Sequence, residues 1–208
     1  MRTICKVIFV VVIGCALGGC ASPNIVIQPS LPISVAINPP GNLSTVRLVM
    51  DGTEPTPQLN RYEEKSDKVQ IGDSESLGVH LSDFWLQEPP QVFIQRVLEN
   101  DLKTWGYKVV TDKEQIQLHG HLNKFSLISR AINLFEFQAD GMIDVELEAI
   151  KGNAIPHYKG HYVGMCTYKT ATEIPNKVNM EKLFNKCVEE FQKQLESDLK
   201  LRAALSAN

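Results

Sequence analysis

The chain lacks an excess of positive charge and lacks a hydrophobic run long enough to cross a membrane. Its 21 lysine and arginine residues are outnumbered by 24 aspartate and glutamate residues, so the formal net charge is −3. A nucleic-acid surface needs clustered cations, and this balance argues against such a partner. The main apolar stretch, residues 7–21, is shorter than the roughly 20 residues that a transmembrane helix needs.

The sequence also lacks the motifs of common catalytic and cofactor sites. It contains no phosphate-cradling glycine loop, no dinucleotide fingerprint and no Ser-His-Asp pattern. Beyond position 20 it has two cysteines, Cys166 and Cys187, and two cysteines without suitably spaced histidines do not form a zinc site. We therefore expect no catalytic residue, no cofactor and no metal ion, and we expect that the protein is not an enzyme.

The start of the chain has the three parts of a secretory signal. Arg2 and Lys6 precede an apolar run, and Leu17-Gly18-Gly19 leads directly to Cys20. This ending resembles the lipobox of bacterial lipoproteins. The resemblance implies a signal peptide at residues 1–19 and acyl chains, such as palmitate, on Cys20. Because Ala21 rather than aspartate follows, it also implies sorting to the outer membrane, with the body on the periplasmic face.

The remaining chain divides into a tether and one domain. Residues 20–32 are rich in proline, serine and asparagine, and we expect them to form a lipidated, flexible tether. Residues 33–208 suit a single periplasmic domain. Within it, residues 53–87 show a poor pattern, with at most a short strand at Val69-Gln70-Ile71, and predict a long connection.

The pattern of the second half predicts two helices around a run of strands. One helix begins at Pro89-Pro90 and ends at Gly106, and a final helix is capped by Asn179 and keeps an apolar stripe up to Leu199. Strands start at Gln115, with a bulge near Lys124, and alternate most clearly over residues 135–149. The order predicts an α+β fold: an antiparallel sheet, built as a long β-meander, with two helices packed on one face.

Gly152-Asn153 is typical of a two-residue hairpin turn and predicts a strand register. In that register the inward pairs are Leu147 with Tyr158, Ile143 with Tyr162, and Ala139 with Cys166. The outward pairs are Glu148 with His157, Glu146 with Lys159, and Asp144 with His161. Gly160 and Gly164 lie on the inner face, where they leave room for a helix.

Three groups of side chains are candidate sites. Cys166 and Cys187 both fall on inward faces, so they form either a disulfide or two buried thiols. His119 and His121, with Asp144 and His161, have the donor types of a metal site, but we favour an ordinary solvated sheet face. Leu81, Phe84, Trp85 and Leu86 form either an exposed partner-binding patch or a cluster that tucks the long connection onto the core; we favour the second.

Several segments resemble the YajG-type family of small bacterial outer-membrane lipoproteins. They are Val46-Arg47-Leu48-Val49-Met50-Asp51-Gly52, Val97-Leu98-Glu99-Asn100-Asp101-Leu102 and Gly106-Tyr107. The resemblance implies no catalytic residues. It favours a structural or accessory interaction module of a cell-envelope assembly, for which a type IV secretion complex of the Dot/Icm kind is one concrete setting. The alternative is a lipid-binding accessory of an envelope transport system. An apolar groove favours the alternative, whereas a filled core with exposed sheet edges favours the assembly role.

Overall fold

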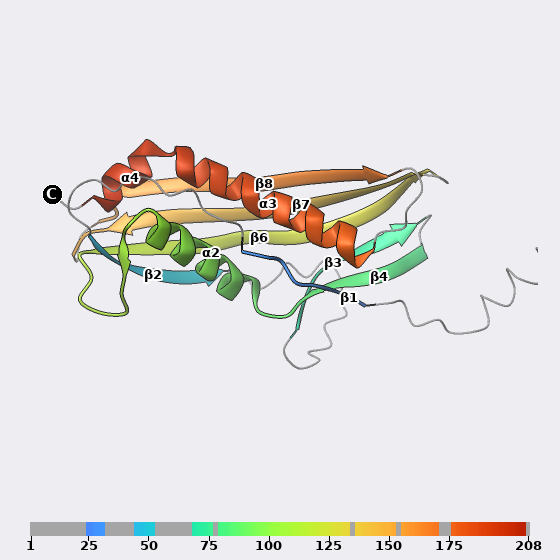
Figure 1. Ribbon diagram of the computed structural model, residues 1–208, viewed down its shortest axis with the longest axis horizontal. Coiled ribbons are helices and arrows are strands. Elements are labelled where there is room, and N and C mark those ends of the chain that lie inside the picture. The colour runs from blue at the N-terminus through green and yellow to red at the C-terminus, as the bar shows by residue number, and fades with distance from the viewer. Residues whose placement is uncertain are drawn as a thin grey trace, which may run out of the picture.

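The computed structural model describes residues 24–31, 44–52, 68–76, 79–133, 136–152, 155–170 and 176–206. Within them, eight strands form one sheet, and three helices lie on the same side of it (Figure 1). The strands are β1 (Ile25–Ile27), β2 (Thr45–Gly52), β3 (Val69–Ser76), β4 (Val79–Leu86), β5 (Lys108–Val109), β6 (Ile116–Asn133), β7 (Glu136–Ile150) and β8 (Tyr158–Thr170). The helices are α2 (Pro90–Thr104), α3 (Lys177–Ser197) and α4 (Leu199–Leu205). In the part of the chain so described, no helix is long and apolar enough to span a membrane.

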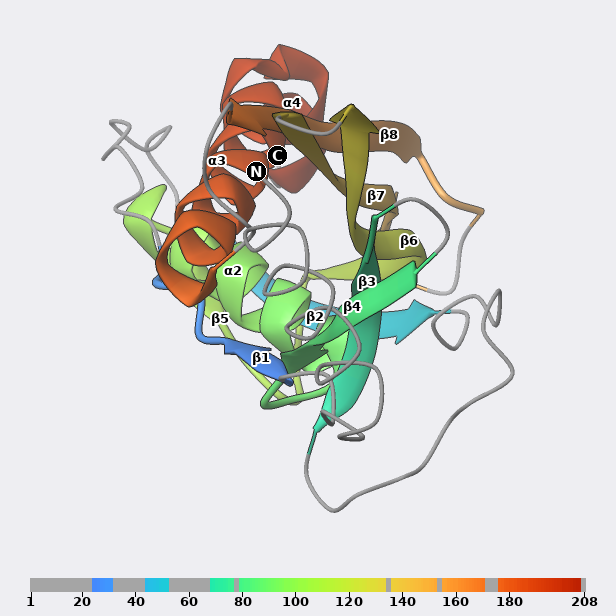
Figure 2. The same ribbon diagram turned by 90° about the vertical axis from the view of Figure 1, so that its right-hand side faces the viewer.

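The sheet is mixed, and the prediction of a purely antiparallel sheet is wrong. Strands β6, β7 and β8 form the expected antiparallel meander. However, β2 and β3 both pair with β6 in parallel, and β1 pairs with β4 in parallel. Along the chain, helix α2 comes after β2 and β3 and before β6. It is part of the crossover connection that joins each of these parallel pairs, and parallel pairing requires such a connection. Figure 2 shows the resulting sheet curling around α2 and α3.

The long strand β6 organises the sheet. One of its edges pairs with β7 along nearly its whole length, and β8 follows β7. The other edge is shared: residues 116–122 pair with β2 and residues 127–130 pair with β3. Between these two partners the register shifts from Leu122 to Lys124, which confirms the predicted bulge. The bulge therefore marks the place where the sheet forks into two branches.

Two segments predicted to be irregular belong to the sheet. Ile25–Ile27, inside the predicted tether of residues 20–32, forms β1, and Ile27 is fully buried. The predicted connection of residues 53–87 contains β3 and β4, which form an antiparallel hairpin. The alternation of β3 is hidden because its buried positions include Asp73 and Ser74 rather than apolar residues.

The β7–β8 pairing is shifted by two residues from the predicted register. Leu147 lies opposite Gly160, Ile143 opposite Gly164 and Ala139 opposite Tyr168, whereas Gly141 lies opposite Cys166. The ladder closes at Ala149 and Tyr158, so the predicted two-residue hairpin is wrong. The predicted register placed Pro156 opposite Ala149, and proline has no N–H to donate there. A shift of two keeps every side chain on its predicted face.

The helices begin close to the predicted residues, but the last one is divided. Pro89 precedes α2, and Gly106, with a φ of 89°, follows its end as predicted. Helix α3 is capped by Asn176, whose side chain accepts from the Asn179 N–H at 3.0 Å, so the predicted cap at Asn179 is wrong. Asp198 separates α3 from α4, and Leu199, predicted to lie on the apolar stripe, is 72% exposed.

Helices α2 and α3 meet the sheet in a filled apolar core. Phe93 of α2, Phe125 of β6 and Phe184 of α3 pack together with ring centroids 5.1 to 6.2 Å apart. A buried polar contact joins the helices as well: Gln192 Nε2 donates to Asp101 Oδ1 at 2.5 Å. These contacts hold both helices on one face of the sheet.

Candidate partner interface

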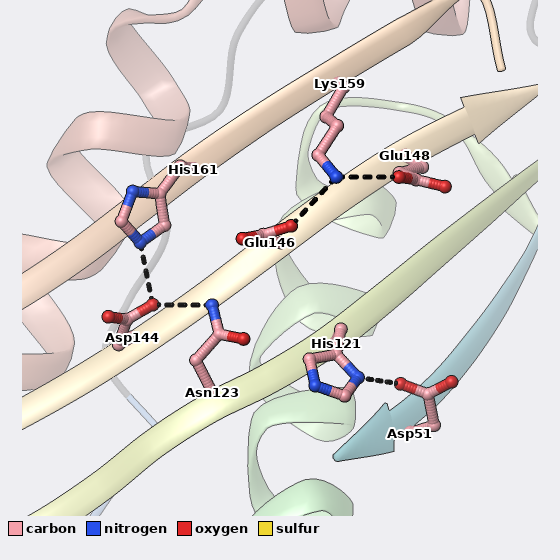
Figure 3. Close-up of polar contacts among 8 residues, drawn as sticks. All are labelled: Asp51, His121, Asn123, Asp144, Glu146, Glu148, Lys159 and His161. Atoms are coloured by element: carbon pink, nitrogen blue, oxygen red, sulfur yellow. Dashed lines mark hydrogen bonds and ion pairs between the residues drawn. The ribbon is translucent and has the colours of Figure 1, made fainter. Parts of the chain in front are cut away.

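The outer face of the sheet carries paired charges (Figure 3). Lys159 Nζ of β8 lies 3.0 Å from Glu146 Oε2 and 3.1 Å from Glu148 Oε1 of β7. His161 Nε2 lies 2.7 Å from Asp144 Oδ1. Two of the charge pairs predicted as direct neighbours, Glu146 with Lys159 and Asp144 with His161, therefore form across the diagonal of the shifted ladder. The hydrogen bond from Lys159 lowers the pKa of Glu146, and the two glutamates raise the pKa of Lys159.

The histidines of this face fall into two separate groups. His119 and His121 both contact Asp51 of β2, at 3.2 Å and 2.5 Å. Asp144 instead contacts His161 and accepts from Asn123 Nδ2 at 2.9 Å. Among the described residues no cluster of His, Cys, Asp and Glu has a geometry that holds a metal ion. The parallel β2–β6 pairing brings Asp51 to both histidines, a contact that no local sequence pattern indicates.

Strand β8 forms a long free edge of the sheet. It is 13 residues long and, within the described part of the chain, pairs only with β7. At one point a side chain occupies the place of a neighbouring strand. The Val163 N–H donates to Gln194 Oε1 at 3.0 Å, and Gln194 Nε2 donates to the Val163 carbonyl at 2.8 Å. The Gln194 amide thus forms the hydrogen bonds with the N–H and C=O groups of Val163 that a peptide group of a neighbouring strand would form.

Beyond Val163 this edge continues toward the end of β8. Hydrogen-bonding groups of an antiparallel strand alternate between its two edges. The N–H and C=O groups of Met165, Thr167 and Lys169 therefore point the same way as those of Val163. The side chains of these three residues are exposed, and Met165 is 65% exposed. An extended segment of another chain can pair with such an edge by main-chain hydrogen bonds.

The aromatic cluster before Pro89-Pro90 does not form an exposed patch. Phe84 and Leu86 point inward from β4 and are buried, whereas Leu81 and Trp85 are half-buried. The preferred interpretation, a cluster that ties this segment to the core, is correct for Phe84 and Leu86. The cluster lies in a strand rather than in a loop, and β1 pairs with it from Ile25 to Ile27.

A surface pocket of about 510 Å³ lies between β2, α2 and the β5 region. Its walls are formed by Arg47, Leu48, Val49, Met50, Gln95, Glu99, Lys103, Val109, Val110 and Thr111. The two cations already have partners, since Arg47 lies 3.5 Å from Glu114 and Lys103 lies 3.8 Å from Glu99. Charged walls of this kind do not suit an acyl chain.

The structure joins Cys166 of β8 to Cys187 of α3 in a disulfide, with their Cα atoms 5.0 Å apart. Glycines make room for this crossing. A Cβ at Gly141 would lie 2.4 Å from Cys187 Sγ, and a Cβ at Gly164 would lie 2.3 Å from the Cys187 carbonyl oxygen. Gly164 therefore has the helix-contacting role predicted for it. The bridge links the end of the meander to the middle of α3.

A second polar link lies where α3 gives way to α4. Asp198 Oδ2 accepts hydrogen bonds from the hydroxyls of Tyr158 and Tyr162 at 2.6 and 2.9 Å. Its Oδ1 accepts from the N–H groups of Lys200 and Leu201 and so caps α4. Burial, followed by the bond to Asp198, raises the pKa of Tyr158 to about 12. Partial burial alone would raise the pKa of Asp198, but these hydrogen bonds outweigh it and lower the pKa.

We expect Asp198→Asn to be less stable at neutral pH by about 1 kcal/mol, because hydrogen bonds to a charged acceptor are stronger than those to a neutral one. The folded-state pKa of Asp198 lies below its ordinary value of 3.8. The contribution of Asp198 to the free energy of unfolding is therefore present above pH 4, and it is lost as the pH falls through the folded-state pKa. Urea unfolding of both proteins between pH 7 and pH 3 measures this. A stability difference that does not shrink in acid would contradict the prediction.

Comparisons with known proteins find a shared fold but do not identify a family. No protein-family description matches the sequence, and no curated protein matches it. Among solved structures, protein XCC0632 from Xanthomonas campestris, a DUF330 protein, has a TM-score of 0.53 at 8% identity, over 82% of this chain and 91% of that one. A "putative lipoprotein" from Caulobacter crescentus CB15 has a TM-score of 0.38 at 14% identity, over 65% of this chain and 92% of that one. The first similarity shows that the fold is shared with a bacterial protein of very different sequence.

Proposed function

We propose that this chain is an acylated outer-membrane lipoprotein whose periplasmic domain is a non-catalytic interaction module. Acyl chains on Cys20 anchor it, and the free edge of β8 receives an extended segment of another envelope protein. The observation that carries this proposal is the edge itself. Strand β8 has 13 residues and, among the described strands, pairs with β7 on one edge, while on its other edge the Gln194 side chain caps Val163. Edges left open in this way are templates for pairing with another chain.

The anchor is supported by the sequence around Cys20, which lies outside the residues that the structure describes. The lipobox-like ending, the short apolar run and Ala21 are consistent with an outer-membrane lipoprotein. Membership of the YajG-type family and service in a type IV secretion complex are narrower proposals. They rest on the sequence resemblance and on fold-level analogy.

The alternative function, a lipid-binding accessory, has less support. Its requirement is an apolar groove of acyl-chain length. The core between the helices and the sheet is filled by the three packed rings of Phe93, Phe125 and Phe184. The pocket beside α2 has charged walls. We therefore favour partner binding over lipid binding.

A photo-reactive residue at Thr167 tests the edge. In membranes of the organism that naturally makes the protein, we expect this residue to crosslink to a partner protein. Met165→Pro should abolish that product, because it removes an N–H that points from the free edge, where proline does not disturb the β7–β8 ladder. Met165→Ala is the matched control, since it shortens the same side chain and keeps the N–H.

The same photo-reactive residue at Val92, an exposed position on α2, serves as the surface control. Crosslinked product should be at least fivefold more abundant from Thr167 than from Val92. Equal yields at the two positions, or survival of the Thr167 product in Met165→Pro, would show that the edge is not the binding site.

A further inference from the structure

The chain enters the sheet at one identifiable end of the molecule. Strand β1 runs parallel to β4, with Ile25 opposite Phe84. The chain before Ile25 therefore lies on the side where β4 begins, at Val79. The end of β6 is on the same side, because β3 and β6 run in parallel and Glu75 lies opposite Arg130. Figure 1 shows β3, β4, β6 and β7 meeting at this end.

The distance from Cys20 to the sheet is short. Ile25 is the fifth residue after Cys20, and a fully extended chain covers at most about 17 Å over that length. Val79 is also five residues from Phe84 along β4, so it lies about 17 Å beyond the start of β1. A lipid anchor at Cys20 therefore cannot lie far beyond the Val79 end. The docking of residues after β1 removes any further slack: the Gln28 N–H donates to Glu181 Oε1 and the Ser30 N–H to Asn185 Oδ1, at 3.0 and 3.2 Å.

The side chains at this end suit contact with lipid. Val79 is 61% exposed and Ile132 is 50% exposed. Both lie next to the connections that close the sheet at this end. The charged residues that the strand registers place at this end include Arg130 and Lys169 as well as Glu75 and Glu136, and these four charges cancel. The end therefore presents apolar groups beside charges whose sum gives anionic headgroups no net repulsion.

We propose that this end of the domain, marked by Val79 and Ile132, rests on the membrane surface and places these two side chains at the headgroup boundary. The inference depends on acylation of Cys20, which is part of the proposed function. It adds an orientation: strands β6 to β8 extend from this end away from the membrane, and the β7–β8 connection with Ile155 is at the far end. The free edge of β8 then runs outward from the bilayer, where it is accessible to a periplasmic partner.

Tryptophan quenching tests this orientation. The acylated full chain carrying Val79→Trp, Ile132→Trp or the control Ile155→Trp is placed in phosphatidylethanolamine–phosphatidylglycerol vesicles with brominated acyl chains. All three positions are exposed; Ile155 is 86% exposed. After subtraction of the emission of the native tryptophans, we expect quenching at positions 79 and 132 to be at least threefold greater than at position 155.

The two proposals fail in different ways. If the protein floats with the vesicles but positions 79 and 132 are quenched no more than position 155, the membrane contact is wrong and the anchor stands. If the purified chain carries no acyl group and does not float, the anchor is wrong and the inference falls with it.

Discussion

Replacing Gly164 with alanine should destabilise the domain by about 3 kcal/mol, near the upper end of the usual cost of overpacking. The added Cβ would lie 2.3 Å from the Cys187 carbonyl oxygen and 2.8 Å from Phe191 Cβ. Because the closest obstacle is helix backbone, no side-chain rotation relieves the clash, and α3 must move off β8. A change of this size should lower the melting temperature by about 6–12 °C.

Met165→Ala is the control for Gly164→Ala. Met165 is the next residue on β8 and is 65% exposed on the other face of the sheet. We expect it to change stability by no more than about 0.5 kcal/mol. Thermal unfolding followed by circular dichroism compares the two variants. Equal stability of both variants would show that α3 does not cross the strand at Gly164.

Removing the bridge between Cys166 and Cys187 should have an effect of similar size. The double variant Cys166→Ala/Cys187→Ala is expected to lose about 3 kcal/mol, since the crosslink closes a loop that the unfolded chain otherwise leaves open. The sequence separation of the two cysteines is 21 residues. A periplasmic location would keep the bridge oxidised.

A reductant distinguishes the bridge from ordinary packing. It should lower the melting temperature of the unsubstituted protein to near that of the double variant, and it should leave the double variant unchanged. Thiol labelling of the unfolded, unreduced protein gives a direct count. Two reactive thiols besides Cys20 would contradict the bridge, and α3 would then depend on its apolar stripe alone.

Local patterns predicted the elements with strong periodicity and clear end signals. Helix α2 follows from Pro89-Pro90, its apolar face and Gly106, and the bulge in β6 follows from the change of phase near Lys124. The division at Asp198 has no such signal. Aspartate is compatible with a helix surface, and its role here depends on Tyr158 and Tyr162, which are distant in sequence.

Features that depend on tertiary contacts were harder to predict from local sequence patterns. The β7–β8 register was wrong by two residues because a favourable turn sequence outweighed Pro156, although the faces were correct. The parallel pairings of β2 and β3 are set by chain crossovers that no local pattern reveals. On the outer face, alternation predicted the pairing of Lys159 with Glu146. The contact of Gln194 with the β8 edge has no local signal, because Gln194 has the sequence pattern of an ordinary polar residue of α3.

The intact mass of the protein, extracted from membranes of cells that express the full chain, tests the lipid anchor directly. We expect a chain that begins at Cys20 and carries acyl groups on that residue. We also expect Cys20→Ala to remain uncleaved, with residues 1–19 still attached. A mature chain without lipid, or normal processing of Cys20→Ala, would contradict the lipid anchor.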